Sequence, residues 1–152
     1  MIRRYLLLLV LTLLAGACAA APPPSATHVL TLHDHTFHVE LATNNAQRDL
    51  GLMHRTHMAA DHGMLFVFPY NAVQTFWMKN TLIPLDMLFF DKDRKLVSMQ
   101  LNVPPCKANP CALYPSGKPA MYVLELAAGT AAQLDIQTGD AFSLEGPIGP
   151  VR

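Results

Sequence analysis

The stretch from Gln74 to Phe90 constrains the fold more than any other part of this chain. It forms two apolar, strand-like runs, and a short polar step, Lys79-Asn80-Thr81, lies between them. Pro84 marks the break, because proline cannot donate to a sheet ladder and must lie at an edge, a bulge or a strand start. The stretch also contains the only tryptophan of the chain, Trp77. It therefore predicts a β-rich fold with polar groups near its centre.

Further strand-like runs, rich in β-branched and aromatic residues, precede and follow this stretch. They span residues 28–32, 36–41, 63–68, 96–103, 120–126 and 141–144. Short helices are expected at 46–53, after capping side chains at 43–45, and at 127–134. Pro69 is expected to end the strand at 63–68, and a loop is expected over 104–119. The pattern predicts one α+β, mainly β domain over residues 28–152, with about seven short strands and two short helices.

The first residues of the chain have the order of an export signal. A basic start, Met1 to Arg4, precedes an apolar run from Tyr5 to Leu14 and then a series of small residues. The apolar run is too short to cross a bilayer core of about 30 Å as a helix. We therefore predict a signal peptide over residues 1–17 and an exported protein, on the periplasmic or cell-surface side of the membrane.

Cys18 lies in the cleavage region of this signal and is a candidate site for a lipid anchor. The sequence Leu14-Ala15-Gly16-Ala17-Cys18 resembles a bacterial lipobox, in which the cysteine becomes the first mature residue and carries acyl chains. The alternative is cleavage at an Ala-x-Ala site such as Ala17-Cys18-Ala19, which would leave no anchor. We predict lipidation at Cys18, with residues 18–27 as an extended tether. The membrane is then a partner through this anchor.

The other two cysteines and the charge balance fit an extracytoplasmic protein. Cys106 and Cys111 are bracketed by prolines, and in an oxidising compartment they are expected to form a local disulfide. A redox-active pair is the alternative, although the spacing is not Cys-x-x-Cys. Eleven basic and eleven acidic residues give a formal net charge of zero. Without a basic run, a nucleic-acid partner is not expected.

Two acidic residues are predicted to lie inside the domain. Asp86 and Glu125 each lie within an apolar, strand-like run, so both are expected to be buried and to have partners. Arg48, Arg55 and Lys79 are the candidate partners, because none of them lies in a charged run. One interpretation is a satisfied polar network that fixes the register of the strands.

The other interpretation is a binding pocket. In it Trp77 stacks on a small molecule or an envelope component, and the polar residues orient that ligand. The candidate binding residues are Arg55, Trp77, Lys79, Asn80, Asp86 and Glu125.

Two alternative functions remain open. A hydrolase acting on cell-wall glycans would use Asp86 and Glu125 as a pair of carboxyl groups. A periplasmic copper protein would use the His/Met segment 53–64, in which His54, His57 and His62 alternate with Met53, Met58 and Met64. Loop histidines and packing methionines explain the same segment without copper. No catalytic elbow, phosphate loop or zinc-protease motif occurs, so no catalytic residue is assigned and no metal or cofactor is expected.

Four motifs together resemble domain-of-unknown-function family 192, a family of small, mostly exported prokaryotic domains. They are Gly51-Leu52-Met53-x-Arg55, Gly63 to Phe68, Phe76 to Asp86 and Val123 to Leu126. The resemblance implies a partly closed, barrel-like sheet and no established activity. It also implies that a set of polar and aromatic positions belongs to the family pattern: Arg55, Trp77, Lys79, Asn80, Thr81, Asp86 and Glu125. The sequence thus favours a lipid-anchored binding or accessory module at the cell envelope over an enzyme.

Overall fold

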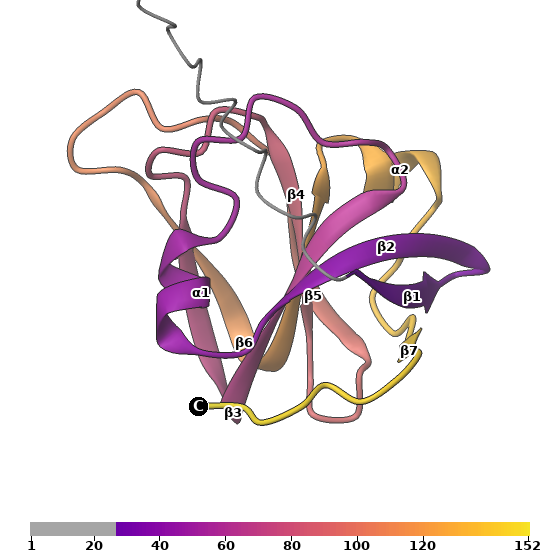
Figure 1. Cartoon of the computed structure of the whole chain (residues 1–152). Helices are drawn as coiled ribbons and strands as arrows, with labels where there is room; N and C mark the ends of the chain where they lie inside the picture. The colour runs from indigo at the N-terminus through magenta and orange to yellow at the C-terminus, as the bar shows by residue number, and fades with distance from the viewer. Residues whose placement is uncertain (1–26) are drawn as a thin grey trace, which may run out of the picture.

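The computed structural model describes residues 27–152, which form one domain around a single curved sheet (Figure 1). The predicted signal peptide, Cys18 and all of the predicted tether except Thr27 lie outside the described residues. Within residues 27–152, no helix is both long and apolar enough to cross a membrane.

Seven strands lie in the order β5-β4-β6-β3-β2-β1-β7. They are β1 (His28–Leu32), β2 (His35–Ala42), β3 (His62–Trp77), β4 (Leu85–Phe90), β5 (Leu96–Val103), β6 (Leu113–Ala127) and β7 (Phe142–Leu144). Neighbouring strands are antiparallel except for β2 and β3. The backbone N–H of Leu96 donates to the carbonyl of Asp140 at 2.7 Å, so the two outer edges of the sheet meet at one end. The expected mainly β, partly closed barrel is confirmed.

The two longest strands differ from the predicted elements. β3 does not end at Pro69 but continues to Trp77, with its register against β6 shifted between Val67 and Ala72. Proline fits there because a bulge removes the need for its missing N–H. β6 starts at Leu113, so the loop after β5 is shorter than expected. β3 and β6 therefore form a long antiparallel pair that extends beyond the rest of the sheet.

The two helices are shorter than predicted, and glycines explain their limits. α1 (Asn45–Leu50) starts after Asn44, whose side chain accepts from the backbone N–H of Gln47. It ends at Gly51, whose φ of +46° belongs to the left-handed region that glycine tolerates. α2 (Thr130–Gln133) starts after Gly129. The connection from α1 to β3 packs beside the outer face of the sheet.

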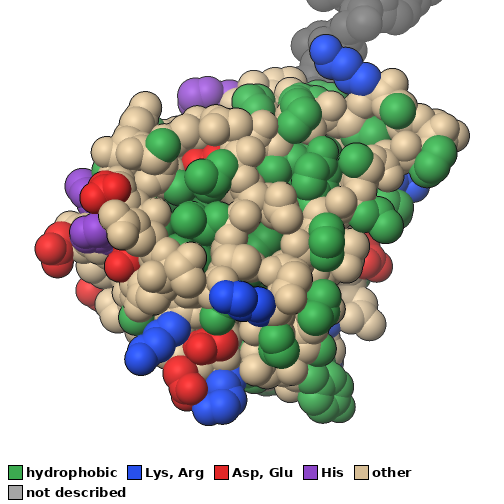
Figure 2. All heavy atoms as spheres, turned by 180° about the vertical axis from the view of Figure 1, so that it is seen from behind, with side chains coloured by type: hydrophobic (Ala, Val, Ile, Leu, Met, Phe, Trp, Pro, Cys, Tyr) green, Lys and Arg blue, Asp and Glu red, His purple; other side chains and the backbone are tan. Residues whose placement is uncertain are grey.

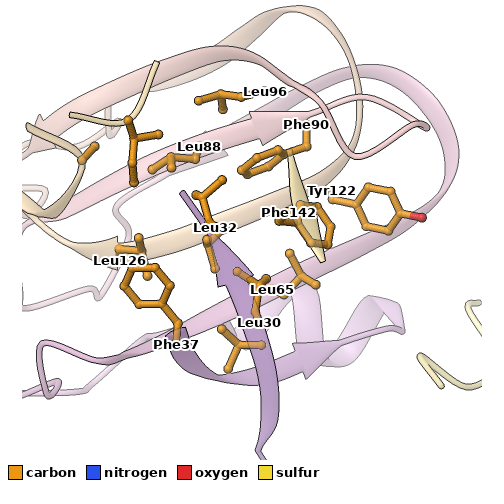
Figure 3. Packing of buried hydrophobic residues seen from close by; sticks show 14 of the residues in the cluster. Leu30, Leu32, Phe37, Leu65, Leu88, Phe90, Leu96, Tyr122, Leu126 and Phe142 are labelled. Atoms are coloured by element: carbon orange, nitrogen blue, oxygen red, sulfur yellow. The ribbon is translucent and has the colours of Figure 1, made fainter. Parts of the chain in front are cut away.

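Each face of the sheet carries its own apolar cluster, because successive side chains of a strand point to opposite faces. The interior cluster fills the barrel, where the ring of Phe142 packs edge-on against Phe90 and Tyr122 (Figure 3). The outer cluster lies on the other face and includes Leu52, Met64, Phe66, Met78, Met87, Phe89 and Val123. The central strand β4 is buried on both faces, as its continuous apolar sequence predicts.

Gly63 allows β3 to approach β6 closely. A Cβ atom at this position would lie 2.6 Å from the carbonyl oxygen of Glu125 and 2.8 Å from a methyl carbon of Leu126. Any side chain larger than hydrogen would separate the two strands where Glu125 lies.

Cys106 and Cys111 form the expected disulfide, with 5.6 Å between their Cα atoms. Cys106 packs against the outer cluster, and β6 starts two residues after Cys111. The bridge therefore restrains the chain directly before Leu113.

Candidate functional site

The candidate site is built around the carboxyl group of Glu125. Glu125 pairs in register with Met64 of β3 and Met87 of β4, so its side chain lies on the outer face of the sheet. Only 4% of the residue is exposed. Among residues 27–152, no group donates a hydrogen bond to this carboxyl or pairs with its charge. Burial alone raises the pKa of Glu125 from 4.5 to about 8.

Glu125 contributes to a pocket of about 350 Å³ between α1, its following loop, and the pair β3–β6. This volume lies within the range of small-molecule sites. The pocket is lined by Arg48, Asp49, Leu50, Gly51, Leu52, Met53, Phe66, Phe68, Thr75, Phe76, Trp77, Thr81, Leu113 and Glu125. Leu50, Trp77 and Leu113 are 58%, 47% and 63% exposed, so they form an apolar rim above the buried acid.

Aromatic rings make up much of the wall. Phe76 lies edge-on to Phe66, with 5.0 Å between ring centroids, and edge-on to Phe68 at 6.1 Å. Edge-on packing holds the rings in fixed positions around the pocket. β3 supplies all three rings, because it continues past its bulge and residues on both sides of the bulge line the same pocket.

Apolar side chains that meet water occur elsewhere on the molecule too. Figure 2 shows the side opposite to that of Figure 1, where hydrophobic side chains gather over the upper part and the right side, and most charged ones lie near the margins. Exposed apolar side chains are therefore not unique to the rim. The combination with an unpartnered, buried carboxyl group distinguishes the pocket.

Arg48 also lines the pocket, but its hydrogen bonds are made within the protein. Its guanidinium donates to the carbonyl of Val67 at 2.7 Å, to Asn45 Oδ1 at 2.6 Å and to the carbonyl of Arg152. It also lies over the ring of Phe68, 5.3 Å from the centroid. Arg48 therefore braces the wall and the C-terminus, and it is not the partner of Glu125.

The polar step between β3 and β4 supports the rim. The ammonium of Lys79 lies 5.0 Å from the ring centroid of Trp77. The carbonyl of Asn80 accepts from the backbone N–H of His54 at 2.8 Å, and the Asn80 amide contacts the sulfur of Met53 at 3.9 Å. These contacts hold the polar step against the loop after α1.

Asp86 is buried on the opposite face of the sheet. It pairs in register with Leu126, a member of the interior cluster, whereas Glu125 pairs with Met87 of the outer cluster. The Asp86 carboxylate accepts from the backbone N–H of Asn102 at 2.8 Å and from that of Ala131 at 3.0 Å. The expected cationic partner is thus replaced by backbone donors. Asp86 and Glu125 cannot flank one substrate, which removes the basis of the glycan-hydrolase alternative.

Arg55 also lies apart from the pocket. Its guanidinium binds both carboxylate oxygens of Glu40, at 2.5 and 2.8 Å, beside a second, more polar cavity. The six predicted binding residues therefore do not converge. Trp77 and Glu125 line one pocket, Lys79 and Asn80 brace its rim, and Arg55 and Asp86 belong to other parts of the fold.

The His/Met segment does not form a common ligand set. Met64 is buried in the outer cluster, Met58 packs against it, and His54 and His57 are exposed in the preceding loop. His62 pairs with its neighbour Asp61 at 2.8 Å. In the part of the chain that the structure describes, no three His, Cys, Asp or Glu side chains are grouped so as to hold a metal ion.

Comparison with known proteins places this fold in a family. The model of DUF192, described as an uncharacterised ACR, matches residues 28–144. The chain belongs to the DUF192 family. No curated protein matches it.

Two solved structures resemble this DUF192 protein. One is the crystal structure of a "putative transcription regulator" from Sinorhizobium meliloti. Its sequence is 39% identical to this chain, its TM-score is 0.73, and the match covers 81% of this chain and 97% of that one. A protein of unknown function from Novosphingobium aromaticivorans is 35% identical, with a TM-score of 0.72, over 82% of this chain and 94% of that one. The match confirms the fold and the family, and the family has no assigned activity.

Sequence reasoning missed most of the pocket wall. Phe66, Phe68 and Phe76 are indistinguishable from core residues in the sequence, and the DUF192 motifs place them only within strands. The prediction that Pro69 ends the strand separated Phe66 and Phe68 from Phe76 and Trp77. A continuous strand with a bulge would have brought them together.

Proposed function

We propose that this protein is a lipid-anchored binding module of the cell envelope, whose ligand occupies the pocket between α1 and the pair β3–β6. One observation carries the proposal: a buried carboxyl group without a partner faces a pocket with an aromatic wall and an exposed tryptophan. A buried carboxyl group that only serves packing is normally hydrogen-bonded, as Asp86 is. Glu125 is instead free to receive a ligand.

Binding accounts for this arrangement better than hydrolysis does. Glycoside hydrolysis normally needs a second carboxyl group about 5–10 Å from the first, on the other side of the scissile bond. Asp49 is the other acid of the pocket, but it lies exposed at the rim. The description of the Sinorhizobium protein as a regulator applies to that protein, and the balanced charge of this chain does not favour a nucleic-acid partner.

Fluorescence of Trp77 tests the pocket, since it is the only tryptophan of the chain. Acrylamide is expected to quench Trp77 in the free protein, because about half of the side chain is exposed. Soluble cell-wall fragments and small-molecule fractions of the envelope are then screened for protection from quenching. The expected result is protection that Glu125→Leu abolishes and Glu145→Leu, a change at an exposed glutamate outside the pocket, retains. A Trp77 already shielded in the free protein would contradict the proposal.

The anchor has a separate test. Mass spectrometry of the mature protein is expected to show acyl chains on an N-terminal Cys18, and Cys18→Ser is expected to release the protein from the membrane fraction. An unmodified N-terminus beyond Cys18 would disprove the anchor and leave the pocket proposal intact.

A further inference from the structure

We infer that the pocket beneath Trp77 binds the ammonium group of a primary amine carried on an apolar body, with the carboxylate of Glu125 as its counter-charge. This inference rests on the proposed function of the same pocket and names its ligand class. It follows from three features of the pocket: the unpartnered acid, the aromatic wall and the state of the other charged groups.

The acid selects a ligand that donates hydrogen bonds. An ionised carboxyl group only accepts hydrogen bonds, and no described residue supplies a donor to Glu125. An anionic ligand would place two negative charges together in a buried space. An ammonium group supplies three N–H donors and the opposite charge, so it satisfies the acid more completely than a hydroxyl group does.

The wall favours a cation over a neutral donor. Phe66 and Phe76 line the same space, and the faces of aromatic rings attract cations. Phe68 also lines it, with the guanidinium of Arg48 over its ring. The rings, together with Leu52 and the rim residues Leu50 and Leu113, would also cover an apolar body. A small ammonium ion alone would leave this surface unused.

The remaining charged groups do not oppose a cation. Among residues 27–152, Arg48 and Asp49 are the other charged residues that line the pocket, and they balance each other formally. The ammonium of Lys79 lies outside this lining, over the ring of Trp77 at the rim. The hydrogen bonds of Arg48 go to Val67, Asn45 and Arg152, which leaves its guanidinium committed to the wall. The register neighbours of Glu125 on β3 and β4 are Met64 and Met87, which carry no charge. Once Glu125 is ionised, its carboxylate is therefore the unbalanced charge among the residues that line the pocket.

The inference links amine binding to proton release. Burial raises the pKa of Glu125 to about 8, so the empty pocket holds a protonated carboxyl at pH 7. Binding of an ammonium group requires the carboxylate, and the proton of Glu125 leaves to solvent. The affinity should therefore rise with pH by about tenfold per unit below pH 8, and level off above it.

Isothermal titration calorimetry with two matched probes tests this inference. Benzylamine carries an ammonium group on an apolar ring, and benzyl alcohol has nearly the same shape without the charge. Titrations at pH 6, 7 and 8, in buffers of different ionisation heat, report both the affinity and the number of protons released. Glu125→Gln removes the charge at constant size, and Glu145→Gln is the control at an exposed site outside the pocket.

The expected result is that benzylamine binds at least about tenfold more tightly than benzyl alcohol at pH 8. Its binding at pH 7 should release close to one proton, and Glu125→Gln should abolish both the preference and the pH dependence. Glu145→Gln should change neither.

Two results would overturn the inference. Equal binding of both probes, without proton release, would mean a neutral ligand and would leave the proposed pocket standing. Failure of benzylamine to bind, while an envelope fraction still protects Trp77, would also refute the amine alone. Failure of both experiments would refute the proposed function as well.

Discussion

Asp86 and Glu125 carry two buried carboxyl groups on the neighbouring strands β4 and β6. Glu125 pairs with Met87, the residue after Asp86, so the two acids point to opposite faces of the sheet and have different surroundings. Asp86 faces the interior cluster and accepts two backbone N–H groups, which tie the ends of β5 and α2 to β4. Glu125 faces the outer cluster and a pocket, and no described group donates to it. Burial by itself therefore does not tell a structural acid from a functional one. The difference between them is the presence or absence of donors, and on this difference we base the proposal that Glu125 binds a ligand.

The comparison is tested most severely by removing Asp86. Asp86→Ala would leave the N–H groups of Asn102 and Ala131 without an acceptor, so it should lower the free energy of unfolding by about 4 kcal/mol. Urea denaturation measures this loss. Asp93→Ala, at an exposed pair with Lys92, should hardly change stability, because water and salt screen such a pair. A small effect of Asp86→Ala would mean that the two acids are equivalent after all.

Glu125→Gln should raise the free energy of unfolding at neutral to alkaline pH, whereas Asp86→Ala should lower it. Between about pH 4.5 and pH 8 the unfolded chain loses the Glu125 proton and the folded protein retains it, so folding takes up a proton. Stability of the wild type should therefore fall as pH rises through this window. Glutamine keeps the shape and removes this dependence. The free energy of unfolding of the variant, minus that of the wild type, should therefore be more positive at pH 8 than at pH 5 by on the order of 3 kcal/mol.

Denaturation curves at both pH values provide the measurement for Glu125→Gln. Glu145→Gln is the matched control, since Glu145 is exposed and should shift neither curve. A wild type whose stability does not decline toward pH 8 would show that Glu125 is already satisfied in the folded protein.

The rim should matter least for stability. Trp77→Ala removes a side chain that is half exposed and a contact with Lys79, so it should lower the free energy of unfolding by about 1 kcal/mol or less. Phe89→Ala, at a fully buried ring of the outer cluster, should cost about 3–5 kcal/mol. Thermal unfolding distinguishes the two. A large loss at Trp77 would make it part of the core instead of the edge of a site.

Much of the fold follows from local patterns. The apolar runs at β1, β4 and β5 and the capping side chain of Asn44 lie where propensity places them, and the burial of Asp86 and Glu125 follows from the strands around them. The irregular joint at Pro69 was not predictable, because a proline in a strand indicates an end unless a partner strand supports a bulge. That support comes from β6, which is remote in sequence.

The candidate site was predictable only in part. The motif residues Trp77 and Glu125 do meet in one pocket, but Arg55 and Asp86 do not join them. Adjacent positions on a strand alternate between faces, so which face holds the pocket depends on how the sheet curls and on where α1 packs. Neither the curl of the sheet nor the packing of α1 can be predicted from the local sequence. The donors to Asp86 are backbone groups, which no pattern of side chains reveals.

The surroundings of Glu125 and the rim of the pocket differ in how far they can vary among related chains. A side chain at position 63 would collide with the backbone of Glu125, so the close approach of β3 to β6 beside the buried acid tolerates almost no change. Leu50 and Leu113 at the rim are exposed and unconstrained by packing, so they can be replaced freely. Related chains are therefore expected to share one way of holding the charged end of a ligand, and to differ in the body of the ligand that they accept.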